Sequence, residues 1–184
     1  IAWHCPPSRL TAQPAALALS PLLRTTSQAR YGVTFDRDVD SILAASASRS
    51  DCASFTPERL ATAFAELFDT GYAHTFEVRD ENGRIVGGGY GLAVGRVFVL
   101  ERVFSREAEA AKAGLARLAQ CLRDWDFALV ECAAGAAAPC AEAFETVSRE
   151  TYLAALAEHT RGDRVGRWPS DGARNPVRRS PRAA

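Results

Sequence analysis

The sequence of 184 residues has no methionine, no Cys-x-x-Cys pair and no excess of either charge. Its 22 basic and 22 acidic residues balance, so no strong global field attracts nucleic acid or a membrane. No apolar run is long enough for a membrane span, and we expect neither a membrane anchor nor a signal peptide. The cysteines are odd in number and scattered, which disfavours a zinc site or a disulfide framework and favours a reducing cytoplasm. They are Cys5, Cys52, Cys121, Cys132 and Cys140.

Both ends of the chain differ in composition from its middle. Residues 1–30 are rich in proline and weakly patterned, and we interpret them as the poorly defined remnant of an N-terminal region. The lack of methionine predicts a fragment or an unusual start codon. Residues 161–184 concentrate Arg and Pro and predict a disordered basic tail, with a phosphate-contacting arm as the alternative. One domain is expected over residues 31–160.

The middle of the chain alternates between strand-like and helix-like patterns. Asn82-Gly83 between two strand-like runs predicts a hairpin. A helix over 106–123 joins two apolar strands, which must then run parallel. An antiparallel meander that leads into a βαβ unit, with helices on both faces, predicts an α+β mixed sheet of the N-acetyltransferase (GNAT) type. The expected order is strand 31–36, helices 39–47 and 57–70, strands 74–80, 84–94 and 97–104, helix 106–123, strand 127–133 and helix 148–159.

The turn between strand 97–104 and helix 106–123 contains no glycine, although GNAT enzymes that use acetyl-CoA carry a glycine-containing loop there. The backbone amides of that loop bind pyrophosphate. Arg106 matches the first position of the loop, but Glu109 stands in place of its central glycine and Glu107 lies beside it. Two carboxylates would repel a pyrophosphate, so acyl-CoA is disfavoured as the donor.

Six blocks of the sequence, in order and at matching spacing, resemble the leucyl/phenylalanyl-tRNA–protein transferases, a branch of this fold that does without CoA. The typical forms in that family are ILWWSPDPR, GHAHSIEV, LVGGxYGVxxG, GESMFSR, LIDCQ and a final RxxYL. The resemblance extends from Ile1 to about His159. The blocks here read IAWHCPPSR (1–9), GYAHTFEV (71–78), IVGGGYGLAVG (85–95), ERVFSR (101–106), LVEC (129–132) and SRETYLAAL (148–156).

The resemblance implies transfer of an aminoacyl group from charged tRNA to an amine. In known members that amine is the N-terminus of a protein that begins with Arg or Lys. The implied partners are the charged 3′ end of a tRNA and a protein N-terminus or a small amine, for a monomeric cytoplasmic enzyme. No metal or other cofactor is implied. The aminoacyl end of the tRNA takes the space of CoA, which explains the missing glycines.

Carried over by position, the resemblance places a pocket for the transferred side chain between strand 97–104 and helix 106–123. At four apolar positions this sequence has a smaller residue than the family, and Ser105 is expected in the same site. Either the pocket is enlarged and prefers a different side chain, or the core has drifted with compensation. The four positions are Gly89, Val103, Leu118 and Val130, where the family has Met, Met, Phe and Ile.

Two aromatic and two basic residues are the candidates for tRNA contacts. Phe55 and Phe64 match a Trp and a Tyr near the terminal adenosine and keep a face on which a base can stack. Packing is the alternative for both. Arg24 and Arg30 are the basic residues left in segment 19–31, where the family carries several Lys and Arg that contact the tRNA backbone.

Two acidic residues are the catalytic candidates. Glu101 matches the carboxylate of the family's GES block in the donor pocket, with a solvent-facing strand residue as the alternative. Glu131 replaces the Asp of an Asp-Cys-Gln motif to which orienting or deprotonating the attacking amine has been assigned. Ala133 replaces the Gln, so we expect the acceptor site to be rebuilt or lost. The alternative function is therefore a catalytically degenerate homologue that binds RNA or a protein.

Overall fold

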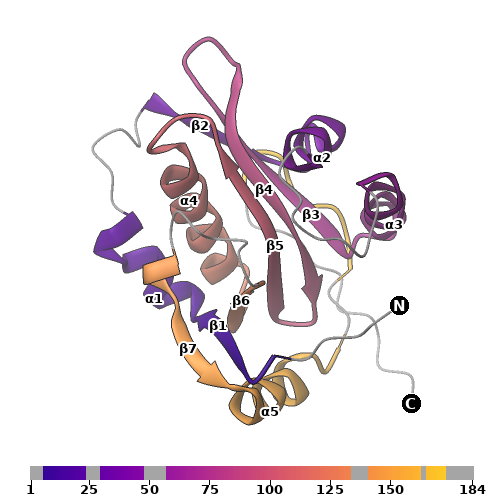
Figure 1. Cartoon of the computed structure of the whole chain (residues 1–184), viewed down its shortest axis with the longest axis vertical. Coiled ribbons are helices and arrows are strands. Elements are labelled where there is room, and N and C mark those ends of the chain that lie inside the picture. The colour runs from indigo at the N-terminus through magenta and orange to yellow at the C-terminus, as the bar shows by residue number, and fades with distance from the viewer. Residues whose placement is uncertain (1–5, 24–29, 48–56, 134–140, 163–164, 173–184) are drawn as a thin grey trace.

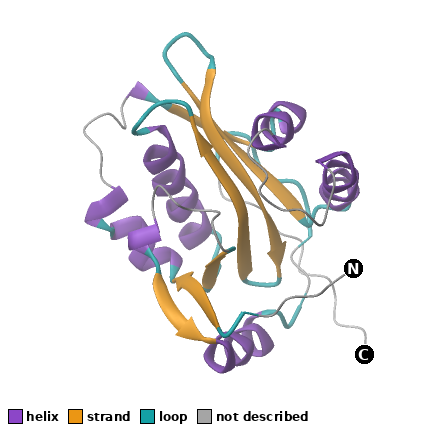
Figure 2. Cartoon of the chain, viewed as in Figure 1, coloured by secondary structure: helices purple, strands orange, loops and turns teal. Residues whose placement is uncertain are grey.

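The computed structural model describes residues 6–23, 30–47, 57–133, 141–162 and 165–172, without the side chains of 57–61. These residues form one seven-stranded mixed sheet in the order β2-β3-β4-β5-β6-β1-β7, with helices against both faces (Figures 1 and 2). The strands are β1 (Ser8–Ala12), β2 (Gly32–Phe35), β3 (Ala73–Arg79), β4 (Ile85–Val94), β5 (Val97–Ser105), β6 (Leu129–Cys132) and β7 (Glu145–Ser148). The helices are α1 (Pro14–Leu19), α2 (Val39–Ala47), α3 (Pro57–Asp69), α4 (Ala110–Asp124) and α5 (Arg149–His159), with short 3₁₀ turns η1 (Pro21–Leu23) and η3 (Ala141–Ala143).

The strand pairing confirms the predicted fold class. Strands β2 to β5 form an antiparallel meander, and β5 pairs parallel with β6 after the crossover through α4. The hairpin between β3 and β4 turns at Asn82-Gly83, where Gly83 has φ of +77°, a conformation that glycine adopts without steric penalty. Strand β6 lies between β5 and β1, in the interior of the sheet.

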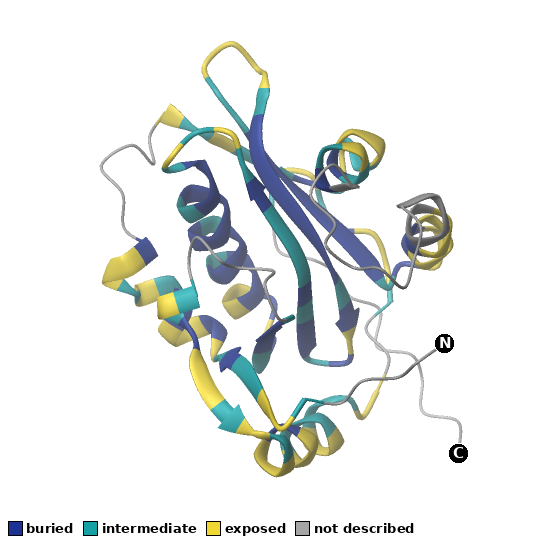
Figure 3. Cartoon of the chain, in the orientation of Figure 1, coloured by how far each residue is buried: buried dark blue, intermediate teal, exposed yellow. Residues whose placement is uncertain are grey.

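Two apolar layers lie on opposite faces of the sheet. The main core lies between the sheet, α4 and α1, and a smaller cluster lies between the sheet, α2 and α3 (Figure 1). Strands β3 and β4 are buried along almost their whole length because both layers cover them (Figure 3). The smaller cluster consists of Ile42, Phe64, Phe68, Ala73, Tyr90 and Phe104. No helix in the described ranges has the length and apolarity to cross a membrane.

Strands β1 and β7 and helix α1 were not predicted from the sequence. The two strands complete the sheet, and α1 completes one of its apolar layers. Strand β1 and helix α1 come from residues 1–30, which were interpreted as poorly defined. Strand β1 pairs antiparallel with β6 on one side and with β7 on the other. Leu17 of α1 is buried in the main core. Proline was interpreted there as a sign of weak structure. Pro14, however, lies in the first turn of α1, a position that proline favours.

A second difference concerns the C-terminal region. Residues 165–172, part of the stretch predicted to be disordered, lie against the domain as a strap. Trp168 is 5% exposed and packs in a ring cluster with Phe35 and Trp125 of the main core. The backbone N–H of Phe35 donates to the carbonyl of Ser170, which fixes the strap along β2. The last twelve positions, 173–184, lie outside the described residues.

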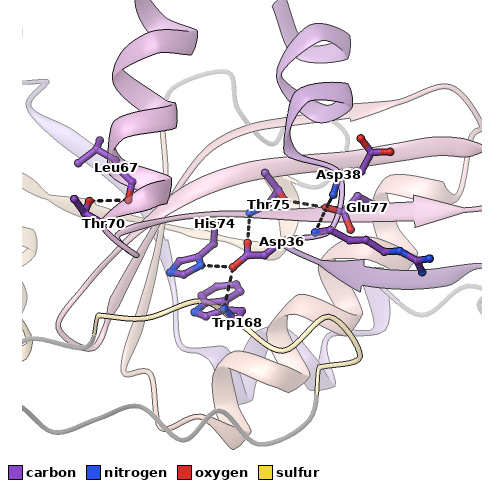
Figure 4. A network of polar contacts seen from close by, with 9 residues as sticks. Asp36, Asp38, Leu67, Thr70, His74, Thr75, Glu77 and Trp168 are labelled. Carbon is purple, nitrogen blue, oxygen red and sulfur yellow. Dashed lines mark hydrogen bonds and ion pairs between the residues drawn. The ribbon is translucent and has the colours of Figure 1, made fainter.

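A buried polar network holds this strap to the sheet (Figure 4). One oxygen of Asp36, Oδ2, lies 2.8 Å from Nδ1 of His74 and accepts a hydrogen bond of 2.9 Å from the backbone N–H of Trp168. The other oxygen, Oδ1, accepts from the backbone N–H of Thr75. The His74 ring stacks on Trp168 with centroids 4.0 Å apart. His74 thus packs near the start of β3, and its partners come from distant segments.

Candidate functional site

Several N–H groups of the β5–α4 turn form hydrogen bonds within the chain. The N–H of Arg106 donates to the carbonyl of Val86, and the N–H of Ala110 donates to the carbonyl of Glu107. Ser105 Oγ accepts from the N–H of Ala111 at 3.1 Å and itself donates to the carbonyl of Glu107. Ser105 therefore caps the first turn of α4 from within. The chain itself therefore engages the N–H groups of Arg106, Ala110 and Ala111, which a phosphate could otherwise use.

Glu131 is the most strongly held acidic group on this part of the sheet. Its residue is 2% exposed, and its carboxylate lies on the face of β6 opposite to Val130, which is buried in the main core. Arg9 of β1 donates to Oε1 at 2.6 Å. Tyr152 of α5 donates to Oε2 from its hydroxyl at 2.8 Å. Both carboxylate oxygens are therefore engaged, in a charge-assisted pair and a phenolic hydrogen bond.

Arg9 and Tyr152 also contact each other, with the guanidinium carbon 5.2 Å from the ring centroid. Contacts at the first turn of helix α5 hold Tyr152 in position for this contact. Ser148 caps the helix by accepting from the N–H of Thr151, and the N–H of Arg149 donates to the carbonyl of Pro7 just before β1. The triad Arg9–Glu131–Tyr152 therefore ties β1, β6 and α5 into one rigid unit.

Glu101 lies at an irregularity in the neighbouring strand. In the pairing of β4 with β5, Tyr90 opposes Arg102 and Gly91 opposes Leu100, so Glu101 has no opposite residue. This is a β-bulge, which bends the strand and re-aims the side chain at the bulge. Leu100 faces the main core, whereas Arg102 is paired with Tyr90 of the smaller cluster. The bulge thus turns Glu101 toward the face that carries Glu131.

The two carboxyl groups are electrostatically coupled. Burial raises the pKa of Glu101, the negative charge of Glu131 raises it further, and Arg102 and Arg9 partly oppose the rise. No described residue forms a hydrogen bond with the Glu101 carboxyl group. Burial and the hydrogen bond to Glu131 raise the pKa of Tyr152, so its hydroxyl remains protonated as a donor. The site thus contains one fixed carboxylate and one carboxyl group without such a bond.

The four predicted pocket positions lie on the α4 side of the sheet. Leu118 and Val130 are 1% and 0% exposed in the main core, and Val103 packs against that core. A Cβ at Gly89 would collide with the carbonyl of Arg102 and lie 2.8 Å from the Phe76 ring. Phe76 therefore fills the space beside Gly89. A substrate-binding role for these positions stays a prediction.

The predicted RNA-contacting residues are only partly described. Phe64 is 4% exposed and packs edge-on against Tyr90, with centroids 4.7 Å apart. Arg30 is exposed and lies over the Tyr31 ring. Phe55 and Arg24 lie outside the described residues. Among the described positions, no group of three or more His, Cys, Asp or Glu is arranged to hold a metal ion.

Sequence reasoning missed the two partners of Glu131. Arg9 ends the IAWHCPPSR block and Tyr152 lies within the SRETYLAAL block, so both stood in segments already singled out. Neither block shows locally that its polar residue reaches a strand 122 or 21 residues away. Ala133, whose N–H donates to the carbonyl of Leu100, brings no polar side chain to this site.

Comparison with known proteins gives matches to one family over most of the chain. A sequence model of "Leucyl/phenylalanyl-tRNA protein transferase" matches residues 13–157. The leucyl/phenylalanyl-tRNA–protein transferase of Pseudomonas fluorescens strain Pf0-1 is 38% identical over 162 residues, which cover 86% of this chain and 71% of the relative. The protein of the same name from strain SBW25 is 35% identical over 173 residues, covering 92% and 76%.

One solved structure of remote sequence shares part of the architecture. A conserved protein of unknown function from Bacteroides thetaiotaomicron VPI-5482 superposes with a TM-score of 0.51 at 13% identity, over 67% of this chain and 49% of that chain. A tandem GNAT protein from the clavulanic acid biosynthesis pathway gives a TM-score of 0.43 at 17% identity, over 77% and 53%. At 13% identity the first likeness concerns the fold alone.

Proposed function

Because the chain belongs to the leucyl/phenylalanyl-tRNA–protein transferase family, we propose that it transfers an amino acid from aminoacyl-tRNA to the amino terminus of an acceptor protein. The observation that carries this proposal is a pair of acidic groups on one face of β5 and β6, of which Glu131 is buried and Glu101 is half-buried. One of them is fixed by Arg9 and Tyr152, and the other has no hydrogen-bond partner among the described residues. Such a pair suits a reaction in which an ammonium group must be bound and then lose a proton.

In the reaction, the nitrogen of the acceptor amine forms a bond with the carbonyl carbon of the aminoacyl ester. The ester C–O bond breaks, the 3′-hydroxyl of the tRNA leaves, and the amine loses a proton. The protein must hold the amine close to the ester and take that proton at the right moment. No step requires a metal or an oxidant, in line with the expected absence of cofactors.

Glu131 is suited to the first task. Both of its oxygens are engaged by groups from β1 and α5, so the carboxylate has a fixed position and a fixed negative charge. A fixed anion orients an incoming ammonium without reorganising during the reaction. We assign to Glu131 the orientation of the acceptor amine.

Glu101 is suited to the second task. Burial and the nearby charge of Glu131 raise its pKa above that of an ordinary carboxyl group, which makes its carboxylate a better proton acceptor. Ala133 has no side-chain amide, unlike the Gln that the family has at this position, and so cannot share this role. We therefore assign to Glu101 the removal of the proton from the attacking amine.

The four positions predicted to select the transferred side chain lie on the α4 side of the sheet, across it from the two carboxyl groups. Phe76 fills the space at Gly89, so the smaller residues at the four predicted positions do not add up to one enlarged cavity there. A small amine as acceptor, a monomeric state and a cytoplasmic location belong to the same proposal.

The alternative is a binding protein without activity, which the loss of the amide at Ala133 favours. Single-turnover transfer by Glu131→Gln and Glu101→Gln separates the two. An enzyme loses roughly 10²-fold or more in rate with each variant while it still binds charged tRNA. Glu150→Gln, an exposed glutamate on α5, is the matched control and keeps the wild-type rate. A wild-type chain that binds charged tRNA but transfers nothing to any amine would establish the binding protein.

A further inference from the structure

A groove at the far end of the smaller apolar layer has no role in the chemistry described so far. It has a volume of about 820 Å³, within the range of ligand-binding sites. Its walls are α2, the β3–β4 hairpin and the residue that follows β5. Ser41, Ala44 and Ala45 give α2 a small and uncharged surface there, and the groove is lined by three arginines and by no acidic residue. The arginines are Arg79, Arg84 and Arg106.

The three guanidinium groups are held to different degrees. Arg79 is anchored by Asp38 at 3.3 Å and by the carbonyl of Gly83. Arg106 donates to the carbonyl of Ile85 and lies over the Phe104 ring, so its position is fixed while its charge is not balanced by these contacts. Arg84 is exposed, and its side chain has no hydrogen-bonding partner within the described ranges.

Two acidic residues near the groove are engaged by other groups. Asp80 directs Oδ1 to the backbone N–H groups of Asn82 and Arg84, so this carboxylate closes the turn. Asp38 is used by Arg79. Two positive charges, those of Arg84 and Arg106, are therefore available to an anion in a groove with small neutral side chains opposite.

The position of the groove relates it to the two carboxyl groups. Ser41, Ala44 and Ala45 belong to α2, which covers the face of the sheet opposite to α4, and Glu101 and Glu131 lie on that same face. Arg106 follows Glu101 by five positions in an extended segment, which places their Cα atoms about 16 Å apart. Arg102 lies between them in sequence. The last few nucleotides of an RNA strand span such a distance.

We propose that the groove lined by Arg79, Arg84 and Arg106 binds the phosphodiester backbone of the tRNA acceptor end, a few nucleotides before the ester. This inference rests on the proposed function and adds an RNA-binding surface separate from Arg24 and Arg30. Arg106 and Arg84 contact phosphate oxygens, and Arg79 supports the wall of the groove. Such contacts position the strand without reading its sequence.

Binding of uncharged tRNA, measured by fluorescence anisotropy over a series of salt concentrations, tests the groove independently of activity. We expect Arg84→Ala and Arg106→Ala each to weaken binding and to reduce the slope of log Kd against log salt by about 0.7, the value for one phosphate contact with a single strand. Arg96→Ala is the matched control, because Arg96 pairs with Asp126 at the other end of β5. Unchanged affinity and slope in both groove variants would overturn the proposal.

A transfer assay with two donors adds a second readout. One donor is charged tRNA, and the other is adenosine that carries the same 3′-aminoacyl ester and has no upstream phosphates. The groove variants should raise KM for charged tRNA and leave transfer from the adenosine ester unchanged. An equal loss with both donors would overturn the proposal, since the defect would then lie in the reaction site or in folding. Failure of the proposed function would look different, as a wild-type chain that transfers from neither donor.

Discussion

Tyr152 donates a hydrogen bond of 2.8 Å from its hydroxyl to Oε2 of Glu131, and this bond joins α5 to the buried strand β6. Arg9 holds the other oxygen of Glu131, so the carboxylate is fixed from two sides. Burying a carboxylate without partners is strongly unfavourable. The triad therefore explains how an acidic residue with 2% exposure is accommodated between two strands.

Removing the phenolic hydroxyl tests this triad. Tyr152→Phe should lower the free energy of unfolding by about 1–3 kcal/mol, because it leaves a buried carboxylate oxygen without its donor. It should also lower kcat for transfer, because Glu131 is held less firmly. Urea denaturation and single-turnover rates measure the two effects.

Tyr31→Phe is the matched control for that substitution. It removes a hydrogen bond of the same length, from Tyr31 to Glu107 at the α4 turn. We expect a smaller loss of stability, since Glu107 is less buried, and an unchanged transfer rate. Equal rate losses in Tyr152→Phe and Tyr31→Phe would show that the triad has no special part in the reaction.

Glu101 should make activity and stability depend on pH in opposite ways. As a proton acceptor it must be ionised, so the transfer rate should fall as pH decreases through its raised pKa, which lies above the ordinary 4.5. Glu101→Gln should lower the rate and remove this limb of the pH profile. A profile of kcat against pH for both proteins gives the comparison.

The stability effect follows from linkage. A carboxyl group whose pKa is raised in the folded state favours folding while it is protonated, and this contribution is lost as pH rises through the folded-state pKa. Glu101→Gln should therefore equal the wild type in stability below pH 4.5 and exceed it at neutral pH. Urea unfolding at the two pH values measures this. A variant less stable than the wild type at neutral pH would contradict the assignment.

Trp168 should be a large contributor to stability although it lies beyond residues 13–157, which the family model matches. It is 5% exposed and contacts aromatic rings of β2, β5 and the end of α4. Trp168→Ala should lower the free energy of unfolding by about 3–5 kcal/mol. Leu153→Ala, at a position that is 50% exposed, should change it by less than about 0.5 kcal/mol. Similar values for the two variants would show that the strap does not stabilise the domain.

Gly89 tests whether Phe76 fills the predicted pocket. Gly89→Ala should destabilise the domain by about 1–3 kcal/mol, because its Cβ meets the Phe76 ring at 2.8 Å as well as the carbonyl of Arg102. Combining it with Phe76→Leu should cost less than the sum of the two single changes, because the smaller side chain makes room. Additive losses would indicate that the two residues are not in contact. Chemical denaturation of the four proteins completes the cycle.

The elements that the sequence predicted correctly are those with local signals. The Asn82-Gly83 turn and the helical pattern of α4 each depend on residues within a few positions of one another. The parallel pairing of β5 and β6 followed from the helix between them. Family resemblance, and no local pattern, identified Glu101 and Glu131.

The features that were missed depend on contacts between distant segments. Strands β1 and β7 are short, and each is stabilised by pairing with the other. Arg9 and Glu131 are 122 residues apart, and the bulge at Glu101 arises from the register between β4 and β5. Trp168 stands in a stretch whose Arg and Pro content is typical of a disordered tail. Burial of this one aromatic side chain in the core holds the stretch against the domain despite that composition.

The most direct test of the account is a transfer assay in which the whole tRNA pool is charged with radiolabelled amino acids and peptides that begin with Arg or Lys are offered as acceptors. The wild-type chain should move label to the peptide, and identification of the product names the transferred amino acid. Glu101→Gln and Glu131→Gln should transfer far more slowly under the same conditions. If no label moves, or if both variants match the wild-type rate, the chain does not work through this pair of carboxyl groups.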